Sequence, residues 1–266
     1  MLGAIAGDII GSRFEHAGIK SKNFELFNHQ SIFTDDTVHT IAVADSLLHN
    51  VPYQCKYREY FHSYPTAGYG RRFRRWAESP DPVPYGSYGN GSAMRVSPIA
   101  WYYDSLDDVL TEALHSAEIT HNHPEGIKGA QAVAAAIYLA RTGTDKEGIR
   151  KYTEKQFNYD LSSSIDVIRP DYTYEVSCQS SVPQAITAFL DSIDFEDAIR
   201  NAVSLGGDSD TQACIAGSIA EAYYGEVPVQ IAQETLKRLD DLLTNIYTKF
   251  IASRVDGSSR MHRNER

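Results

Sequence analysis

The stretch GAIAGDIIG at residues 3–11 places a glycine at every fourth position of an apolar segment. Residues with this spacing share one face of an α-helix, and each glycine there costs about 1 kcal/mol relative to alanine. Close packing against another backbone is the compensation that such a smooth face permits. The sequence therefore predicts a first helix with a smooth small-residue face, against which another backbone packs closely.

Helical periodicity continues outward from this segment. Apolar residues recur at helical spacing in residues 37–49, 106–121, 125–141, 183–192, 194–205, 210–224 and 228–249. Strand signals are few, because residues 167–176 lack clean alternation and residues 80–90 form a loop rich in Pro, Gly and Tyr. We expect an all-α fold, a compact orthogonal multi-helix bundle in a single domain at 1–252, followed by a disordered charged tail at 253–266.

The bulk composition excludes several classes of partner. The chain has 266 residues and a formal net charge of −10, which argues against nucleic acid or an anionic membrane as the main partner. No apolar run is long enough to span a bilayer, and the start lacks a basic leader. Three widely spaced cysteines suggest reduced thiols, so we expect a cytoplasmic protein.

Two acidic clusters stand far apart in the chain, and each marks the start of a predicted helix. The first is Thr34-Asp35-Asp36, and the second is Asp208-Ser-Asp210-Thr211. Asp and Thr at such positions are ordinary helix caps. Capping, however, needs only one side chain per helix start. If the clusters met in one cleft, their carboxylates would repel each other unless cations lay between them, and such hard oxygen ligands suit Mg²⁺, Ca²⁺ or Mn²⁺.

Other candidate residues have two interpretations each. The glycine-rich loop at 85–94 suits either a phosphate or a plain turn. The arginines after Gly68-Tyr69-Gly70 either meet a pyrophosphate or form a solvated helix face. His121, at a helix end, either orients a ligand or complements the helix dipole. Glu15 is either solvated or reaches the cleft.

These segments together resemble the ADP-ribosylglycohydrolase family. The resemblance begins with Gly3–Asp8, Gly11-Ser12 and Glu15, and continues through residues 33–37 and 89–95. It then includes Thr120-His121 and Gly129-Ala130, and ends with residues 206–211 and 216–217. Each motif is weak alone, but their combination in this order is highly specific. The stretch at 145–180 is distinct, and the C-terminal tail falls outside the resemblance.

The resemblance implies an all-α bundle with a binuclear Mg²⁺ centre, for which Mn²⁺ is a substitute. The implied metal ligands are Thr34, Asp35, Asp36, Asp208, Asp210 and Thr211, and the implied catalytic residues are Asp35, Asp36, Asp208, Asp210 and Glu15. Residues implied to bind substrate are Gly68, Tyr69, Gly70, Asn90, Gly91, Ser92, Met94 and His121. Glu15 matches a mobile glutamate that gates the cleft.

The implied activity is hydrolysis of the bond between ADP-ribose and a modified target. The expected partner is an ADP-ribosylated protein or a small molecule that contains ADP-ribose, with no membrane and no nucleic acid. Two alternatives remain: a metal-dependent phosphoesterase acting on a related metabolite, and a catalytically silent relative that binds ADP-ribose. The sequence does not distinguish arginine, serine, another side chain or a nucleobase as the linked group.

Overall fold

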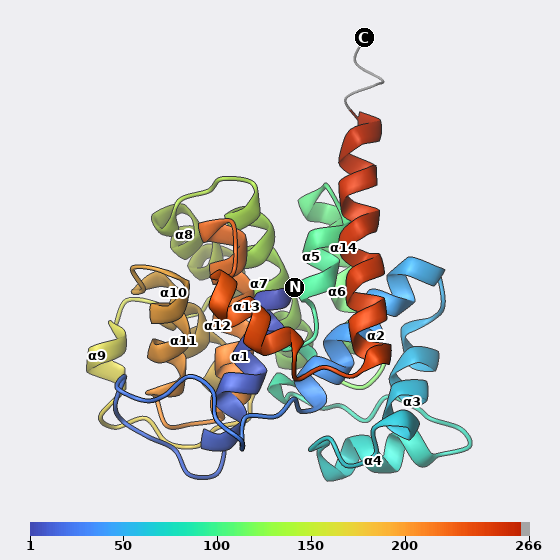
Figure 1. Ribbon diagram of the computed structural model, residues 1–266, viewed down its shortest axis with the longest axis horizontal. Helices are drawn as coiled ribbons and strands as arrows, with labels where there is room; N and C mark the ends of the chain where they lie inside the picture. The colour runs from blue at the N-terminus through green and yellow to red at the C-terminus, as the bar shows by residue number, and fades with distance from the viewer. Residues whose placement is uncertain (262–266) are drawn as a thin grey trace.

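The computed structural model describes the backbone of residues 1–261 and the side chains of residues 1–254 (Figure 1). The fold is all-α, as predicted. The helices of the described residues are α1 (Leu2–Gly11), α2 (Asp35–His49), α3 (Tyr53–Ser63), α4 (Arg71–Glu78), α5 (Ser97–Tyr102), α6 (Leu106–Glu118), α7 (Pro124–Arg141), α8 (Lys146–Phe157), α9 (Ile165–Ile168), α10 (Cys178–Leu190), α11 (Phe195–Val203), α12 (Ser209–Tyr224), α13 (Val229–Leu236) and α14 (Asp241–Met261), with short 3₁₀ turns at Ser12–Phe14 and Asn90–Ser92.

The glycine face of α1 packs directly on the backbone of α12. A Cβ atom added to Gly3 would lie 2.2 Å from the Gly217 oxygen, and one added to Gly7 would lie 2.0 Å from the Ala213 oxygen. At Gly11 the same atom would lie 2.4 Å from the Ser209 oxygen. The order of these contacts makes the two helices antiparallel, so α1 ends beside the first residues of α12. The predicted tight packing is confirmed.

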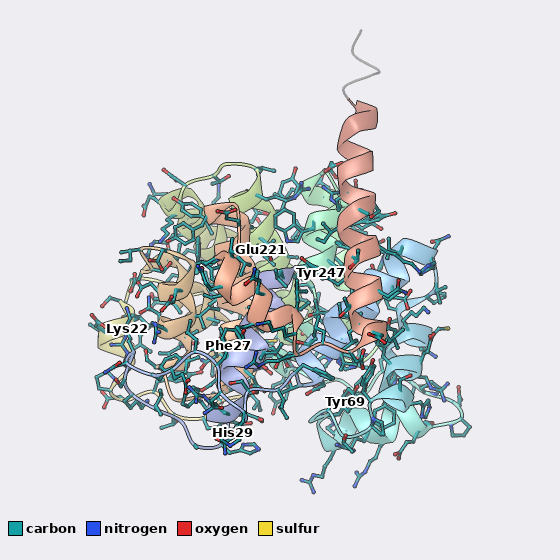
Figure 2. All side chains as sticks on the ribbon, in the orientation of Figure 1. Lys22, Phe27, His29, Tyr69, Glu221 and Tyr247 are labelled. Carbon is teal, nitrogen blue, oxygen red and sulfur yellow. The ribbon has the colours of Figure 1, made fainter. Side chains whose placement is uncertain are left out.

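The two helices form the centre of the molecule (Figure 1). α12 also packs on α7, α10 and α11, whereas α1 also contacts α2 and α13. At the start of α1, Glu221 of α12 accepts hydrogen bonds from the backbone N–H groups of Leu2 at 3.2 Å and Gly3 at 2.8 Å, and Glu221 is marked in Figure 2. The chain's first helix is thus fastened to α12 along its whole length.

Two predicted helix boundaries are wrong. Pro183 does not begin a helix but lies inside α10, because that helix starts where the Cys178 N–H donates to the Tyr88 oxygen at 2.8 Å. The segment 228–249 is divided into α13 and α14. Asp240 interrupts it, since its carboxylate accepts from the Leu243 N–H at 3.0 Å and starts a new helix.

The end of the chain differs in part from the expected tail. α14 extends from the body of the molecule and continues to Met261, so residues 253–261 are helical in backbone. Residues 262–266 of the expected tail lie outside the described residues. Among the residues that the structure describes, no helix combines the length and apolarity needed to cross a membrane.

Candidate active site

One buried carboxylate on α1 fixes the start of α2. Asp8 accepts hydrogen bonds from the Thr34 N–H at 2.9 Å, the Thr34 hydroxyl at 2.7 Å and the Thr37 N–H at 3.1 Å, and also from the Thr37 hydroxyl. Burial raises the pKa of Asp8, although these four donors favour its charged form. α1 therefore contacts α12 through its glycines and positions α2 through Asp8.

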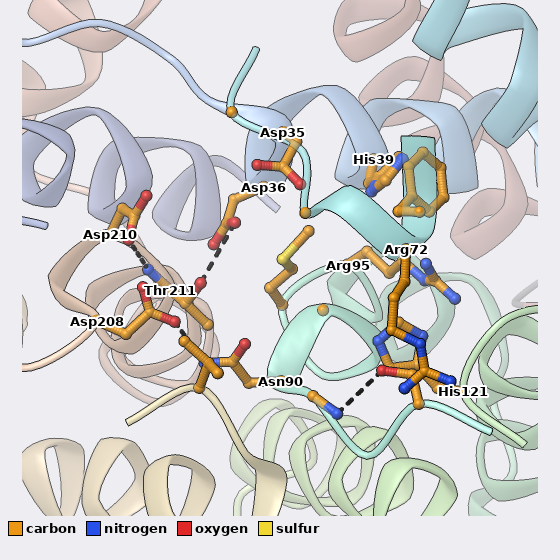
Figure 3. A pocket seen from close by; sticks show the side chains of 18 of the residues that line it. Asp35, Asp36, His39, Arg72, Asn90, Arg95, His121, Asp208, Asp210 and Thr211 are labelled. Atoms are coloured by element: carbon orange, nitrogen blue, oxygen red, sulfur yellow. Dashed lines mark hydrogen bonds between the residues drawn. The ribbon is translucent and has the colours of Figure 1, made fainter. Parts of the chain in front are cut away.

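This arrangement brings the two acidic clusters together. The Thr211 hydroxyl, in the first turn of α12, donates a hydrogen bond to Asp36 Oδ1 in the first turn of α2 at 3.4 Å. Figure 3 shows Asp35 and Asp36 on one side of a shared cleft and Asp208, Asp210 and Thr211 on the other. The clusters, which are far apart in the sequence, thus meet in space.

Capping accounts for Thr34 but not for the aspartates. Thr34 is the N-cap of α2, and its hydroxyl accepts from the Asp36 N–H at 3.3 Å. Asp208 occupies the N-cap position of α12, yet its side chain makes no capping bond. The Asp208 carboxylate instead accepts from the Asn90 side-chain amide at 2.6 Å. Asp210 Oδ1 accepts from the adjacent Thr211 N–H at 2.9 Å, so each of these carboxylates has a partner and keeps further lone pairs for another role.

Glu15 completes the acidic cluster. It follows the 3₁₀ turn after α1, and α1 ends beside the start of α12. Carboxylate oxygens of Glu15, Asp208 and Asp210 all lie within 4.8 Å of one another. The Tyr174 hydroxyl donates to Glu15 at 3.4 Å. Glu15 thus reaches the cleft, as the second of its two interpretations required.

Burial raises the pKa of every carboxyl group in the cluster, and repulsion from neighbouring carboxylates raises it further for Glu15, Asp35, Asp36 and Asp210. Burial, followed by the charges of Asp8 and Asp208, raises the pKa of Asp35 to about 8. The pKa values of Asp36 and Asp210 are raised well above the usual range, first by burial and then by neighbouring carboxylates. Asp208 is raised by burial, although the Asn90 hydrogen bond favours its charged form. Ionising all four groups together requires a compensating positive charge.

The cluster has the chemistry of a divalent-cation site. Asp36 Oδ2 is buried and has no hydrogen-bond partner among the described residues, which leaves a strong acceptor unsatisfied. Carboxylate and hydroxyl oxygens are the ligands that Mg²⁺ and Mn²⁺ prefer. Cations placed between the helix starts would satisfy that oxygen and permit the neighbouring aspartates to ionise together. The residues present therefore fit such ions.

The cluster lies in a pocket with a volume of about 410 Å³. Most of the predicted site residues line it: Glu15, Asp35, Asp36, Gly68, Gly70, Asn90, Gly91, Met94, His121, Asp208, Asp210 and Thr211. A Cβ atom added to Gly68, whose φ is +105°, would lie 3.1 Å from Asp35 Oδ1. The Gly68–Gly70 segment thus approaches the acidic cluster, and its first glycine is required by the left-handed backbone.

Three predicted residues are not among those that line the pocket. The Thr34 hydroxyl donates to Asp8 at 2.7 Å and accepts from the Asp36 N–H, which leaves one lone pair for a further ligand. The Ser92 hydroxyl donates to the Gly126 oxygen of α7 at 2.7 Å, so it faces the helix behind the loop. Tyr69 is buried against Phe73, with ring centroids 5.3 Å apart, and Figure 2 marks its position near α4. The Ser92 and Tyr69 side chains therefore support the pocket instead of lining it.

The far end of the pocket is basic and aromatic. The guanidinium of Arg72 lies 4.9 Å from the ring centroid of Tyr85 and donates a hydrogen bond to the backbone oxygen of Tyr85. Arg95 is buried, and its Nη2 donates to the Ser116 oxygen at 2.7 Å. Figure 3 shows both arginines near His121, across the pocket from the carboxylates. The pocket is thus acidic at one end and positively charged at the other.

His121 lies at this basic end in its neutral form. Burial, then Arg95 and Arg72, holds its pKa well below the usual range. Its Nδ1 is hydrogen-bonded to the Thr120 hydroxyl at 2.7 Å, and a Cβ atom added to Gly91 would lie 3.3 Å from its Nε2. Nε2 therefore faces the Gly91 loop and is the nitrogen placed to meet a ligand there.

Several site residues escaped the sequence reasoning. Asp8 belonged to the quoted glycine segment, but nothing in the sequence connected it to Thr34 and Thr37. His39 and Tyr174 line the pocket from positions outside the motifs, whereas Tyr85 and Arg95 lie in motif segments but were given no role there. Tyr174 belongs to the distinct stretch at 145–180. This stretch pairs with the glycine-rich loop through the hydrogen bond that the Asn90 N–H donates to the Val176 backbone oxygen at 2.8 Å. Only tertiary contacts identify these residues.

Comparison with known proteins identifies the family of this chain. The family model for ADP-ribosylglycohydrolase matches residues 1–262. This chain therefore belongs to the ADP-ribosylglycohydrolase family, and the resemblance inferred from its motifs is confirmed.

Individual relatives support the assignment. The chain is 28% identical to ADP-ribosylhydrolase ARH3 of Danio rerio, over 93% of this chain and 88% of that protein. It is also 28% identical to the ARH3 protein of Homo sapiens, over 94% and 92% respectively. ADP-ribosylarginine hydrolase Tri1 of Pseudomonas putida is 30% identical over 56% of this chain and 41% of that protein.

A solved structure gives the same result. The "ADP-ribosylglycohydrolase-related protein complex" superimposes with a TM-score of 0.73 at 25% identity, covering 94% of this chain and 95% of the other. The similarity therefore extends across almost the whole fold and is not limited to the site.

Proposed function

We propose that this protein is a metal-dependent hydrolase that cleaves the glycosidic bond between ADP-ribose and a modified target, and so releases ADP-ribose. A modified protein side chain is the preferred target. The observation that carries the proposal is the contact of Thr211 with Asp36 inside a pocket of about 410 Å³. Family membership supplies the class of bond.

The acidic cluster is the proposed site of two Mg²⁺ ions, with Mn²⁺ as a substitute. Thr34, Asp35 and Asp36 would provide one set of ligands, and Asp208, Asp210 and Thr211 the other, with Glu15 beside the second set. When bound, such ions supply Lewis-acid chemistry, which polarises sugar hydroxyls and lowers the pKa of water. The unsatisfied Asp36 oxygen and the raised carboxyl pKa values support this assignment.

The opposite end of the pocket is proposed to bind the diphosphate and the sugar attached to it. The backbone of Asn90 and Gly91 lies in a short 3₁₀ turn that lines the pocket. Neutral His121 presents Nε2 to the Gly91 loop, and Arg72 adds a positive charge at this basic end of the pocket. This polarity orients ADP-ribose with its phosphates toward the arginine and its terminal ribose toward the carboxylates.

The carboxylates then have two tasks in the reaction. Breakage of the bond at the anomeric carbon produces positive charge on the ribose, which nearby carboxylates stabilise electrostatically. One of Asp35, Asp36, Asp208 or Asp210 accepts a proton from the attacking water, whose oxygen bonds to the anomeric carbon. The target leaves with the bonding electron pair of the broken bond, and that same proton is passed on to it. No covalent intermediate with the protein is required. Glu15, held at the rim by Tyr174, is proposed to assist at the entrance to the cleft.

A direct test combines one substitution with metal removal. Asp208→Asn and EDTA treatment should each abolish the release of ADP-ribose from a modified protein. The release is measured by chromatography of the nucleotide product. Asp107→Asn, at an exposed position on α6, is the matched control and should retain full activity. Full activity of Asp208→Asn, or of the EDTA-treated protein, would reject the proposal.

The chemical nature of the target requires a separate experiment. One relative is named for ADP-ribosylarginine, whereas the ARH3 relatives carry no linkage in their names. A panel of substrates with ADP-ribose attached to arginine, to serine or to a nucleobase, assayed with and without Mg²⁺, would identify the linkage. Release of phosphate products in place of ADP-ribose would favour the phosphoesterase alternative.

A further inference from the structure

His39 is an unusual side chain in the pocket wall. It lies in the second turn of α2, lines the pocket and is only 2% exposed. Neither of its ring nitrogens has a hydrogen-bond partner among the described residues. Figure 3 shows it on the same helix as Asp35 and Asp36, on the side nearer Arg95.

The surroundings of His39 would suit an apolar side chain better. Its ring packs against Tyr57, Tyr69 and Phe73, with centroids 5.3, 5.2 and 4.6 Å away. These aromatic faces provide packing but do not satisfy the imidazole nitrogens. A buried polar group without a partner carries a desolvation cost. Such violations of polar satisfaction are expected at functional positions.

The environment also fixes what His39 can bind. Burial, together with the charges of Arg95 and His121, lowers its pKa well below the usual range, so the ring is neutral. A neutral imidazole has one donor nitrogen and one acceptor nitrogen. The two nitrogens point in different directions, so one ligand group reaches only one of them. A hydroxyl can pair with either nitrogen, because it donates to the acceptor or accepts from the donor, whereas an ionised phosphate or carboxylate can pair only with the donor. A hydroxyl is therefore the partner that suits His39 whichever nitrogen faces the pocket.

Helix geometry places that hydroxyl beside the acidic cluster. His39 is separated from Asp35 by four residues and from Asp36 by three, so the three side chains share one face of α2. Neighbours at these spacings have Cβ atoms about 5–6 Å apart. A single sugar ring that meets the two aspartates therefore also meets His39, one helical turn farther into the pocket.

We propose that His39 binds a hydroxyl of the terminal ribose, with the ribose lying along the Asp35, Asp36 and His39 face of α2. This inference rests on the proposed function, because it assumes that ADP-ribose occupies the pocket. It adds a sugar-binding residue at a position that no motif identified. It also explains why the fold retains an unsatisfied imidazole in an aromatic setting.

Calorimetric titration with two ligands in Mg²⁺ tests the proposal. ADP-ribose carries the terminal ribose, whereas ADP lacks it. His39→Met fills similar space without the polar nitrogens, and it should weaken ADP-ribose binding about tenfold, the equivalent of losing about 1.4 kcal/mol, with ADP affinity unchanged. His39→Gln has an amide that donates and accepts, and it should restore most of the ADP-ribose affinity.

Thermal unfolding separates this role from a structural one. His39→Met should melt at or above the wild-type temperature, because it removes buried groups without partners. Thr153→Val is the matched control, since Thr153 is fully buried on α8 with an unpartnered hydroxyl and lies outside the pocket. It should likewise keep or raise the melting temperature, but it should leave both affinities unchanged.

Other outcomes would overturn the proposal. Equal ADP-ribose affinity in wild type and His39→Met would show that the imidazole does not contact the ligand. Equal weakening of ADP and ADP-ribose would assign His39 to the nucleotide part instead of the terminal ribose. If wild-type protein fails to bind ADP-ribose with Mg²⁺ present, the proposed function itself fails, and that result is distinct from both.

Discussion

The two helix starts that form the acidic cluster are held in place by opposite means. The start of α12 lies against α1 because glycines remove every obstructing side chain, as at Gly7 and Gly11. The start of α2 lies against α1 because a side chain is present, the carboxylate of Asp8 with its four hydrogen bonds. A single short helix thus places both sets of oxygen atoms, one by close backbone approach and one by polar attachment.

The backbone contact should be the more sensitive of the two. Gly7→Ala puts a methyl group 2.0 Å from the Ala213 oxygen, and neither helix backbone can move without disturbing the core. We expect a loss of about 3 kcal/mol or more in the free energy of unfolding, measured with urea. In the control Gly70→Ala, where no atom lies within 4 Å of the added Cβ, stability should change little. Equal stability of the two variants would contradict the account of α1 and α12.

The polar attachment should be the next most sensitive. Asp8→Asn replaces a carboxylate, which only accepts hydrogen bonds, by an amide. The amide NH₂ group would face N–H and O–H donors and cannot accept from them, so at least part of the four-bond arrangement is lost. We expect about 2–4 kcal/mol of destabilisation and weaker Mg²⁺ binding, measured by urea unfolding and by calorimetry. Thr37→Val, which removes only one of the donors, should have a smaller effect on both quantities. The reverse order would mean that Asp8 does not organise the start of α2.

The acidic cluster should make metal-free protein less stable as pH rises. The pKa of Asp35 is raised to about 8 from a usual value of 3.8. Both states are protonated at Asp35 below the lower value. Between the two pKa values, Asp35 ionises in the unfolded chain but keeps its proton in the folded protein. The free energy of unfolding therefore falls as pH rises from about 4 to about 8, and above that this carboxyl causes no further loss.

Urea midpoints in EDTA between pH 5 and pH 9 provide the measurement. Asp35→Asn removes the titrating group, so its profile should be flatter than that of wild type. Added Mg²⁺ should stabilise wild type most at high pH, because ligands must be ionised to bind the cation. Parallel profiles for wild type and Asp35→Asn would show that this carboxyl does not titrate as the structure implies.

The contact that joins the two regions should have the smallest effect on stability. Thr211→Val removes the long 3.4 Å hydrogen bond to Asp36 but keeps the shape of the side chain. We expect less than about 1 kcal/mol of destabilisation, together with roughly tenfold weaker Mg²⁺ binding because an oxygen ligand is lost. Unchanged Mg²⁺ affinity would remove Thr211 from the proposed ligand set.

The part of the fold that depends on local pattern could be predicted from the sequence. The glycine spacing predicted close backbone packing of α1, although the structure was needed to identify α12 as its partner, and the Thr-Asp clusters marked two helix starts. α8 was missed because its buried positions Ile149, Thr153 and Phe157 include a polar residue that obscures the apolar period. Its N-cap, Asp145, which accepts from the Gly148 N–H at 2.8 Å, was the signal available.

The sequence predicted the candidate site residues only where they belong to a recognisable motif. The convergence of the clusters required two distant helix starts to meet, which the family resemblance implied and the smooth faces made feasible. Asp8 acts through contacts with Thr34 and Thr37 that no spacing along the chain encodes. His39 shares a helical spacing with Asp35 and Asp36, but only the structure shows that its nitrogens have no partner among the described residues. Tyr69 and Ser92 were in motif segments, but motif membership does not determine which way a side chain points.

The hydrogen bond from Asn90 to Asp208 has a mechanical consequence. It ties the glycine-rich loop to one carboxylate of the cluster, so a shift of the loop is transmitted to that acid over a single 2.6 Å contact. If the loop binds the nucleotide as proposed, the bound nucleotide should also set the orientation of the Asp208 carboxylate. A substrate that lacks the phosphates should therefore be hydrolysed more slowly as well as bound more weakly. The reason is that binding energy from the phosphates is used to align the reacting bond.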